Sequence, residues 1–157
     1  MSVYEPWNEE RTRSIVAAHS HLEGPLMPIL HTVQETFGFV PEAAIPVIAH
    51  ELNLSRAEVH GVVTFYHDFR RQPAGQTVLK VCRAEACQSM GCESLVKHAE
   101  DRLGIACGET TADGRVTFET IYCLGLCATA PSAMVDGKIV GRLNTAKLDQ
   151  ILAEAGA

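Results

Sequence analysis

The sequence predicts an α+β protein (an α/β sandwich) in two parts, a helical bundle followed by a small sheet with helices packed against it. The pattern of apolar residues changes near residue 70. Before that point these residues recur at helical spacing, and beyond it short β-branched runs appear. All six cysteines lie in the second part. We therefore expect a helical domain over 1–72 and a mixed domain over 73–157.

Four helices are expected in the first part. Asn8, which precedes two glutamates, indicates a helix start. Gly24-Pro25 ends that helix and opens a second one, whose apolar residues follow the spacing of one helical face. Pro41 suits the first position of a third helix, although Pro46 weakens this prediction because a proline beyond the first turn removes a hydrogen bond. The motif S-x-x-E at 55–58 is a capping box that begins the fourth helix.

The second part follows a break, RRQPAG at 70–75, which is typical of a linker. We expect the order strand, helix, strand, strand, strand, helix. These elements are Thr77–Cys82, Ser89–Leu103, Val116–Cys123, Ala133–Val135, Lys138–Val140 and a helix capped by Asn144. The dipeptide Asp136-Gly137 is a strong hairpin signal between the two short strands. This order describes a thioredoxin-like plan.

Composition excludes several classes of protein. A chain of 157 residues is too short for a large multidomain enzyme. Its 13 Lys and Arg against 19 Asp and Glu give a net charge of −6, which disfavours binding to a nucleic-acid backbone. No apolar run approaches the roughly 18 residues that span a membrane, and no signal peptide is visible. We expect a soluble, cytoplasmic protein with no nucleic-acid partner and no direct membrane insertion.

Four cysteines form two pairs, Cys82-x₄-Cys87 and Cys123-x₃-Cys127, separated by 35 residues. The first member of each pair ends a predicted strand, and the second lies in the loop that follows. If the two strands are neighbours, all four sulfurs converge at one edge of the sheet. Four thiolates suit either Zn²⁺ or an iron–sulfur cluster. Two separate pairs supply the two ligands that each iron of a 2Fe–2S cluster needs.

Other interpretations of the cysteines remain open at this point. Structural zinc usually uses tighter spacing but permits this one, so a zinc-stapled interaction module is an alternative. A disulfide scaffold suits small secreted chains better. We expect Cys92 to be a buried core thiol and Cys107 to be a bystander. The chain has no nucleotide-binding glycine motif and no evident catalytic residue, so we do not expect it to bind NAD or flavin itself.

The complete pattern C-x₄-C-x₃₅-C-x₃-C, with VHGVVTFYHDF at 59–69 and YCLGLCATAPSAMVDGKIVGRL at 122–143, resembles a known family. That family is the small thioredoxin-like 2Fe–2S subunit of NADH dehydrogenase modules, and the resemblance runs from about residue 9 to 152. It implies that Cys82, Cys87, Cys123 and Cys127 hold one 2Fe–2S cluster. It also implies a larger partner subunit that binds FMN and NAD(H).

Within this family, the segment CRAEACQSMG at 82–91 is most similar to the gamma subunit of soluble, molybdenum-containing, NAD-dependent formate dehydrogenases. Complex I versions commonly read Gly-Thr-Ala before the second cysteine. The resemblance implies an electron-transfer subunit that is not catalytic alone. FMN, NAD and the molybdenum cofactor would then lie on partner subunits, one of them the molybdenum-containing formate dehydrogenase subunit. The alternatives are the equivalent subunits of NADH:quinone oxidoreductase (complex I) and of an NAD-reducing hydrogenase.

Overall fold

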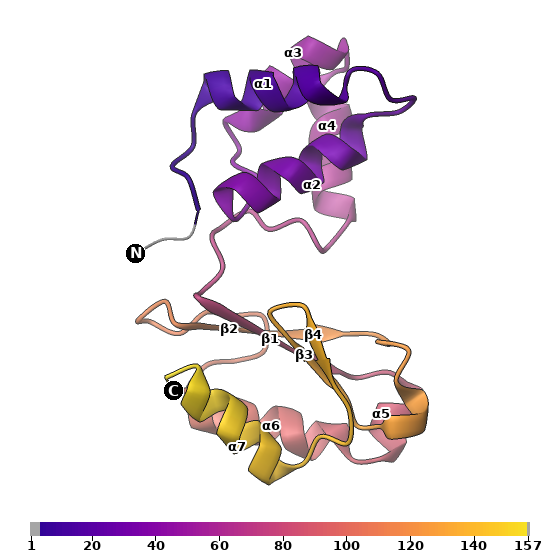
Figure 1. Cartoon of the computed structure of the whole chain (residues 1–157), viewed down its shortest axis with the longest axis vertical. Coiled ribbons are helices and arrows are strands. Elements are labelled where there is room, and N and C mark those ends of the chain that lie inside the picture. The colour runs from indigo at the N-terminus through magenta and orange to yellow at the C-terminus, as the bar shows by residue number, and fades with distance from the viewer. Residues whose placement is uncertain (1–3, 157) are drawn as a thin grey trace. The chain divides into compact units, whose positions relative to one another are not determined.

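The computed structural model describes residues 4–156, which separate between Pro73 and Ala74 into two compact units. The first unit is helical and the second contains a sheet (Figure 1). The helices of the first unit are α1 (Glu9–His19), α2 (Leu26–Phe37), α3 (Ala44–Leu52) and α4 (Arg56–Phe65). The second unit contains β1 (Thr77–Cys82), α5 (Glu85–Ser89), α6 (Cys92–Leu103), β2 (Val116–Ile121), the short 3₁₀ helix η1 (Cys127–Thr129), β3 (Ala133–Val135), β4 (Lys138–Val140) and α7 (Thr145–Glu154). The predicted α+β class is confirmed.

The helical unit begins its helices where the sequence predicts caps. The side chain of Asn8 accepts a hydrogen bond from the backbone N–H of Arg11 at 3.1 Å. At α4, the backbone N–H of Glu58 donates to the Ser55 hydroxyl, and the Glu58 carboxylate accepts from the Ser55 backbone N–H. The apolar faces of the four helices then meet in one core, which includes Ile15, Val16, Ile29, Leu30, Val33, Phe37, Ile48, Val59 and Val63.

The third helix begins later than the sequence predicted. Pro41 lies ahead of the helix and not at its first position, because α3 starts at Ala44. The carbonyl of Pro41 instead accepts a hydrogen bond from the N–H of Ala44 at 2.9 Å, in a preceding turn. With this start, Pro46 falls within the first turn, where backbone N–H groups have no partner inside the helix. The proline therefore removes no helical hydrogen bond.

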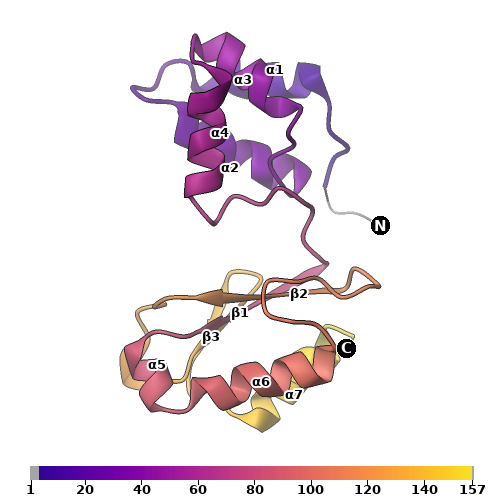
Figure 2. The ribbon, with the colours of Figure 1, turned by 180° about the vertical axis from the view of Figure 1, so that it is seen from behind.

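The sheet of the second unit has the strand order β2-β1-β3-β4. β1 runs parallel to β2 and antiparallel to β3, and β3 and β4 form the predicted hairpin. Lys80 lies opposite Glu119 in the parallel pair, with their charged atoms 3.5 Å apart. Helices α6 and α7 lie together on one face of the sheet in both views (Figures 1 and 2). Leu79 and Phe118 belong to the core that this unit encloses.

Two element boundaries in this unit differ from the prediction, each at a residue in the left-handed region. The predicted helix 89–103 starts instead at Cys92, because Gly91 has φ +85° and separates it from α5. The strand predicted over 116–123 ends at Ile121, because Cys123 has φ +76° and turns the chain out of the sheet. The Asp136-Gly137 turn is confirmed, with φ values of +47° and +81°.

Within residues 4–156, none of the helices combines the length and the apolar character needed to cross a lipid bilayer.

We predict that Ser55→Ala destabilises the helical unit by about 1 kcal/mol, because α4 loses the hydroxyl that accepts from its first turn. Urea unfolding followed by circular dichroism measures this change. Ser14→Ala is the matched control, since Ser14 is an exposed serine inside α1. Alanine is the better helix former there, so the control should not lower stability. Equal losses in the two variants would contradict a role for the cap.

Candidate metal centre

The paired cysteines are positioned by the two parallel strands. Cys82 is the last residue of β1 and lies opposite Ile121, the last residue of β2. Because parallel strands end at the same edge, the two loops that follow them begin side by side. Cys87 lies in α5, five residues beyond the end of β1, and Cys127 opens η1 after β2. The two strands are neighbours, which is the condition under which the sequence placed the four cysteines together.

The four sulfurs come together in two pairs, one from each loop. Sγ of Cys123 lies 3.7 Å from Sγ of Cys127. This separation equals the edge of a tetrahedron around a metal with bonds to sulfur of roughly 2.3 Å. The Cys87 thiol is close enough to Cys82 to contribute to lowering its pKa. Cys123 raises the pKa of Cys127 through a hydrogen bond and through its charge, and Cys87 also raises it, so the two pairs are close enough to interact.

Backbone amides surround the sulfur of Cys82. Burial raises the pKa of the Cys82 thiol, but hydrogen bonds from the backbone N–H groups of Ala84, Cys123 and Leu124 lower it. These hydrogen bonds and the Cys87 thiol lower the pKa by more than burial raises it, so the pKa of Cys82 lies below its usual value. The left-handed turn at Cys123 also brings the N–H of Gly125 to 3.3 Å from the Cys123 sulfur. These donors stabilise thiolates, which are the forms that bind metals.

The two pairs differ in burial. Cys82 and Cys87 are each only 2% exposed, whereas Cys123 and Cys127 are exposed to solvent. We call Cys82 and Cys87 the inner pair and Cys123 and Cys127 the outer pair. Apolar side chains pack around the inner pair and keep water from it: Ala84, Ile121, Leu124 and Ala130. The site therefore has one dry side and one side open to solvent.

The site fits a two-iron cluster of the kind that takes two thiolates on each iron. Each loop presents two sulfurs, and amide donors already point at two of the four. The two pairs are adjacent, because the backbone N–H of Cys123 donates to the Cys82 sulfur.

Comparison with known proteins identifies the family. A sequence model described as "Thioredoxin-like [2Fe-2S] ferredoxin" matches residues 12–156, which is nearly the whole chain. The chain belongs to this family. It accordingly carries one 2Fe–2S cluster, and the alternative of a zinc-stapled module is set aside.

Two relatives are subunits of an NADH-quinone oxidoreductase and of an NADP-reducing hydrogenase. The chain is 40% identical over 132 residues to a subunit of the NADH-quinone oxidoreductase of Pseudomonas aeruginosa, covering 82% of this chain and 80% of the relative. It is 36% identical over 132 residues to the HndA subunit of the NADP-reducing hydrogenase of Solidesulfovibrio fructosivorans, covering 84% of this chain and 77% of the relative. The predicted resemblance to small subunits of NADH dehydrogenase modules is confirmed.

A solved structure shares the fold. The crystal structure of an NAD⁺-reducing [NiFe]-hydrogenase in the H₂-reduced state matches 83% of this chain with a TM-score of 0.73 and 24% sequence identity. The match spans 22% of the hydrogenase chain, so this protein corresponds in fold to one part of a longer polypeptide. The predicted thioredoxin-like arrangement is confirmed by this likeness and by the family match.

The two remaining cysteines lie nearby without forming a pair. Cys92 is fully buried beside the inner pair, and burial raises its pKa, so its thiol is stabilised in the neutral form. Burial likewise raises the pKa of Cys107, which packs at the edge of the sheet unit's core. Arg83, which follows Cys82, donates two hydrogen bonds to the Glu93 carboxylate at 2.8 and 2.7 Å. Its charge is therefore largely offset.

Sequence reasoning missed Ser132. Its side chain is 1% exposed, and its hydroxyl lies 3.6 Å from the Cys87 sulfur. The serine directly precedes β3, which was predicted correctly, but only the pairing of β3 with β1 brings it to the site. The position of Ser132 beside Cys87 therefore follows from the pairing of two strands and from no local sequence motif.

We predict that serine in place of any one of Cys82, Cys87, Cys123 or Cys127 abolishes or strongly perturbs the visible absorbance and the EPR signal of the reduced state. Oxygen binds iron less well than sulfur does and deprotonates less readily. Iron and acid-labile sulfide must be counted beside each spectrum, because a misfolded variant would mimic the loss of a ligand.

Cys92→Ala and Cys107→Ala are the matched controls. Cys92→Ala should leave both spectra nearly unchanged and cost about 1 kcal/mol of stability for the cavity that it leaves. Cys107→Ala should cost less, since Cys107 is only partly buried. A normal cluster in one of the four serine variants, with its loss in Cys92→Ala, would overturn the ligand assignment.

Proposed function

We propose that this chain is the one-electron carrier of a cytoplasmic NAD-dependent formate dehydrogenase complex, with its cluster held by Cys82, Cys87, Cys123 and Cys127. The observation that carries the choice of complex is the segment CRAEACQSMG at 82–91, which includes both inner cysteines. Formate oxidation and hydride transfer would belong to partner subunits that hold the molybdenum cofactor, FMN and NAD. The chain itself holds no catalytic residue in this proposal.

The residues of the site support a carrier role. A bound 2Fe–2S cluster takes up and releases one electron at a time. The inner cysteines anchor it in apolar surroundings, and the amides on the Cys82 sulfur stabilise negative charge without moving when charge changes. The outer cysteines face solvent, where a redox partner can approach. Exposed Tyr122 and Met90 adjoin the two loops and supply apolar contact area for docking.

Two alternative complexes are supported by the relatives. Their names include a subunit of NADH-quinone oxidoreductase and a subunit of an NADP-reducing hydrogenase. In either of these complexes the cluster would perform the same one-electron transfer next to a nucleotide-binding subunit. The three candidates therefore differ in partner and electron donor and not in the chemistry of this chain.

Affinity purification of the tagged chain from its native host tests the choice of complex. We expect a flavin- and NAD-binding subunit together with a molybdenum-containing subunit, and formate should reduce the cluster in that preparation. Co-purification of membrane quinone-reductase subunits, or reduction by hydrogen and not by formate, would assign the chain to one of the other complexes. The Cys123→Ser variant is the control, since it should retain its partners without the normal EPR signal.

We predict a low midpoint potential for the cluster, about −400 mV, as for other all-cysteine 2Fe–2S centres of the plant type. Four thiolates give the site a negative charge, and the chain already carries a net charge of −6, so adding an electron is unfavourable. Dye-mediated titration followed by EPR measures the midpoint. A value above zero would contradict ligation by four cysteines.

We propose that the helical unit, residues 1–72, is the docking part of the chain, and that residues 73–157 form the cluster domain. Phe65 is 73% exposed at the end of α4 and stacks edge-on against the half-exposed Tyr66. Phe65 and Tyr66 belong to the segment 59–69. Val63 and Phe69 of the same segment lie in the bundle core, so only part of the segment is available to a partner. Such an exposed aromatic pair is costly to solvate and favours burial in an interface.

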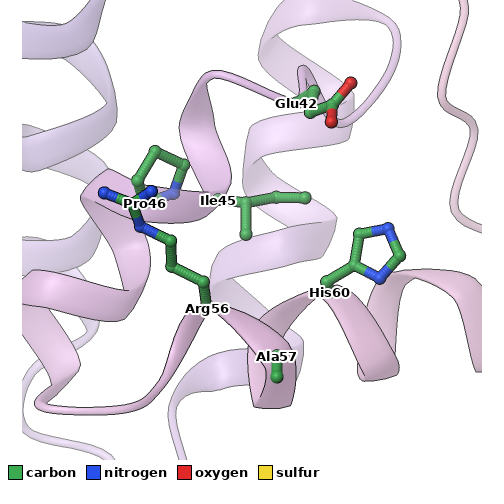
Figure 3. A pocket seen from close by; sticks show the side chains of 6 residues that line it. All are labelled: Glu42, Ile45, Pro46, Arg56, Ala57 and His60. Carbon is green, nitrogen blue, oxygen red and sulfur yellow. The ribbon is translucent and has the colours of Figure 1, made fainter.

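The same unit has an open pocket of about 430 Å³ between α3 and α4. Figure 3 shows Ile45 in its middle, with Arg56 and His60 to either side. An apolar floor with a charged rim suits a partner side chain.

We predict that Phe65→Ser weakens association with the flavin subunit at least tenfold and leaves the cluster spectrum unchanged. Losing one buried aromatic anchor costs that much in typical interfaces. Leu22→Ser is the matched control, because Leu22 is another exposed apolar residue of the helical unit. Deleting residues 1–70 should likewise retain the spectrum and abolish assembly, measured by size-exclusion chromatography. Assembly that survives the deletion would refute the docking role.

A further inference from the structure

Ser132 contacts both residues of the inner pair. Its hydroxyl oxygen lies 3.6 Å from Sγ of Cys87, and its carbonyl accepts a hydrogen bond from the N–H of Cys82 at 2.9 Å. Ser132 is 1% exposed and Cys87 2% exposed, so water does not compete for this contact. A buried hydroxyl needs a hydrogen-bond partner, and the Cys87 sulfur is the partner that the structure provides.

The direction of this hydrogen bond depends on the state of the sulfur. Between a hydroxyl and a free thiol, either atom can donate. A cysteine that binds iron does so as a thiolate and has no proton to give. The Ser132 hydroxyl then holds the only proton of the pair, so it donates and the Cys87 sulfur accepts. Hydrogen bonds to a charged acceptor are stronger than those between neutral groups.

We propose that Ser132 is a positioning residue that raises the midpoint potential of the cluster by donating this hydrogen bond to Cys87. The inference rests on the ligand set given under the proposed function. One-electron reduction brings an electron from the reduced flavin of a partner, moves no proton and increases the negative charge on the sulfurs. A fixed donor at one sulfur stabilises that added charge, and therefore favours the reduced state.

The side chain of Ser132 is distinct from the other donors at the site. The N–H groups at Cys82 and Cys123 belong to the backbone, so no substitution removes them without changing the loop. The hydroxyl of Ser132 can be deleted while its backbone carbonyl keeps its bond to Cys82. Ser132 is thus a position at which a change of side chain alone can shift the potential.

The test compares Ser132→Ala with the wild-type full-length protein by dye-mediated titration. We expect the equilibrium constant for reduction to fall about tenfold, which for one electron is about 59 mV toward more negative potential. Thr117→Val is the matched control. Thr117 is 4% exposed, and its hydroxyl oxygen accepts from the N–H of Gly75 at 2.7 Å. It lies four residues before Ile121 in β2, roughly 13 Å along the strand, so its loss should lower stability without shifting the potential.

Iron, sulfide and EPR measurements accompany each titration and separate the possible failures. If the wild type itself lacks two irons and two sulfides, or if a ligand variant keeps its cluster, the ligand assignment fails, and the role of Ser132, which rests on it, fails with it. An intact cluster with unchanged potential in Ser132→Ala overturns the role of Ser132. An equal shift of the midpoint potential in Thr117→Val also overturns the role of Ser132.

If Ser132→Ala does not retain iron, Ser132→Cys carries the test, because a thiol is a weaker donor of similar size. Its midpoint must lie below that of the wild type, with unchanged iron content. A midpoint equal to the wild type, or loss of the cluster from both variants, refutes the proposal, because the hydroxyl would then be irrelevant to the potential or necessary for assembly.

Discussion

The cysteine site depends on the parallel pairing of β1 with β2. Two strands that run in the same direction end at the same edge, and the backbone hydrogen bonds continue one residue further, from the N–H of Arg83 to the carbonyl of Ile121. The two loops therefore leave the sheet from neighbouring positions, about 4.8 Å apart. The register matters equally, because a slip by one residue would turn Cys82 toward the opposite face. No cysteine of the helical unit is required, and that unit has none.

The inner and outer pairs of cysteines are stabilised in different ways because they differ in burial. A buried thiolate loses its contact with water, which is costly unless fixed donors replace the solvent. The inner pair has such donors in the backbone amides around Cys82 and in the hydroxyl beside Cys87. The outer pair remains in contact with water and needs fewer of them. A site of this kind combines a rigid, dry anchor with an open side at which a redox partner can make contact.

Local signals in the sequence predicted the elements well. The capping box at Ser55, the Asp136-Gly137 turn and the β-branched run of β1 each act within a few residues, so they can be identified without the fold. The spacing of the cysteines likewise indicated two pairs, whose meeting depended on the pairing of β1 with β2. What could not be predicted depends on distant contacts or on unusual backbone angles. Ser132 reaches the site through the pairing of β3 with β1, and Gly91 separates α5 from α6 through its left-handed conformation.

The backbone conformation of Cys123 would link the folding of its loop to the proposed binding of iron. A residue with a β-carbon at φ +76° adopts a conformation that costs of order 1–3 kcal/mol. Glycine at position 123 would relieve this strain, but it has no thiol. The chain retains the thiol and the strain together. Metal–thiolate bonds release far more free energy than this strain consumes. With the proposed ligand set, iron binding would offset this strain, and amide exchange over residues 122–127 would slow when the cluster is bound.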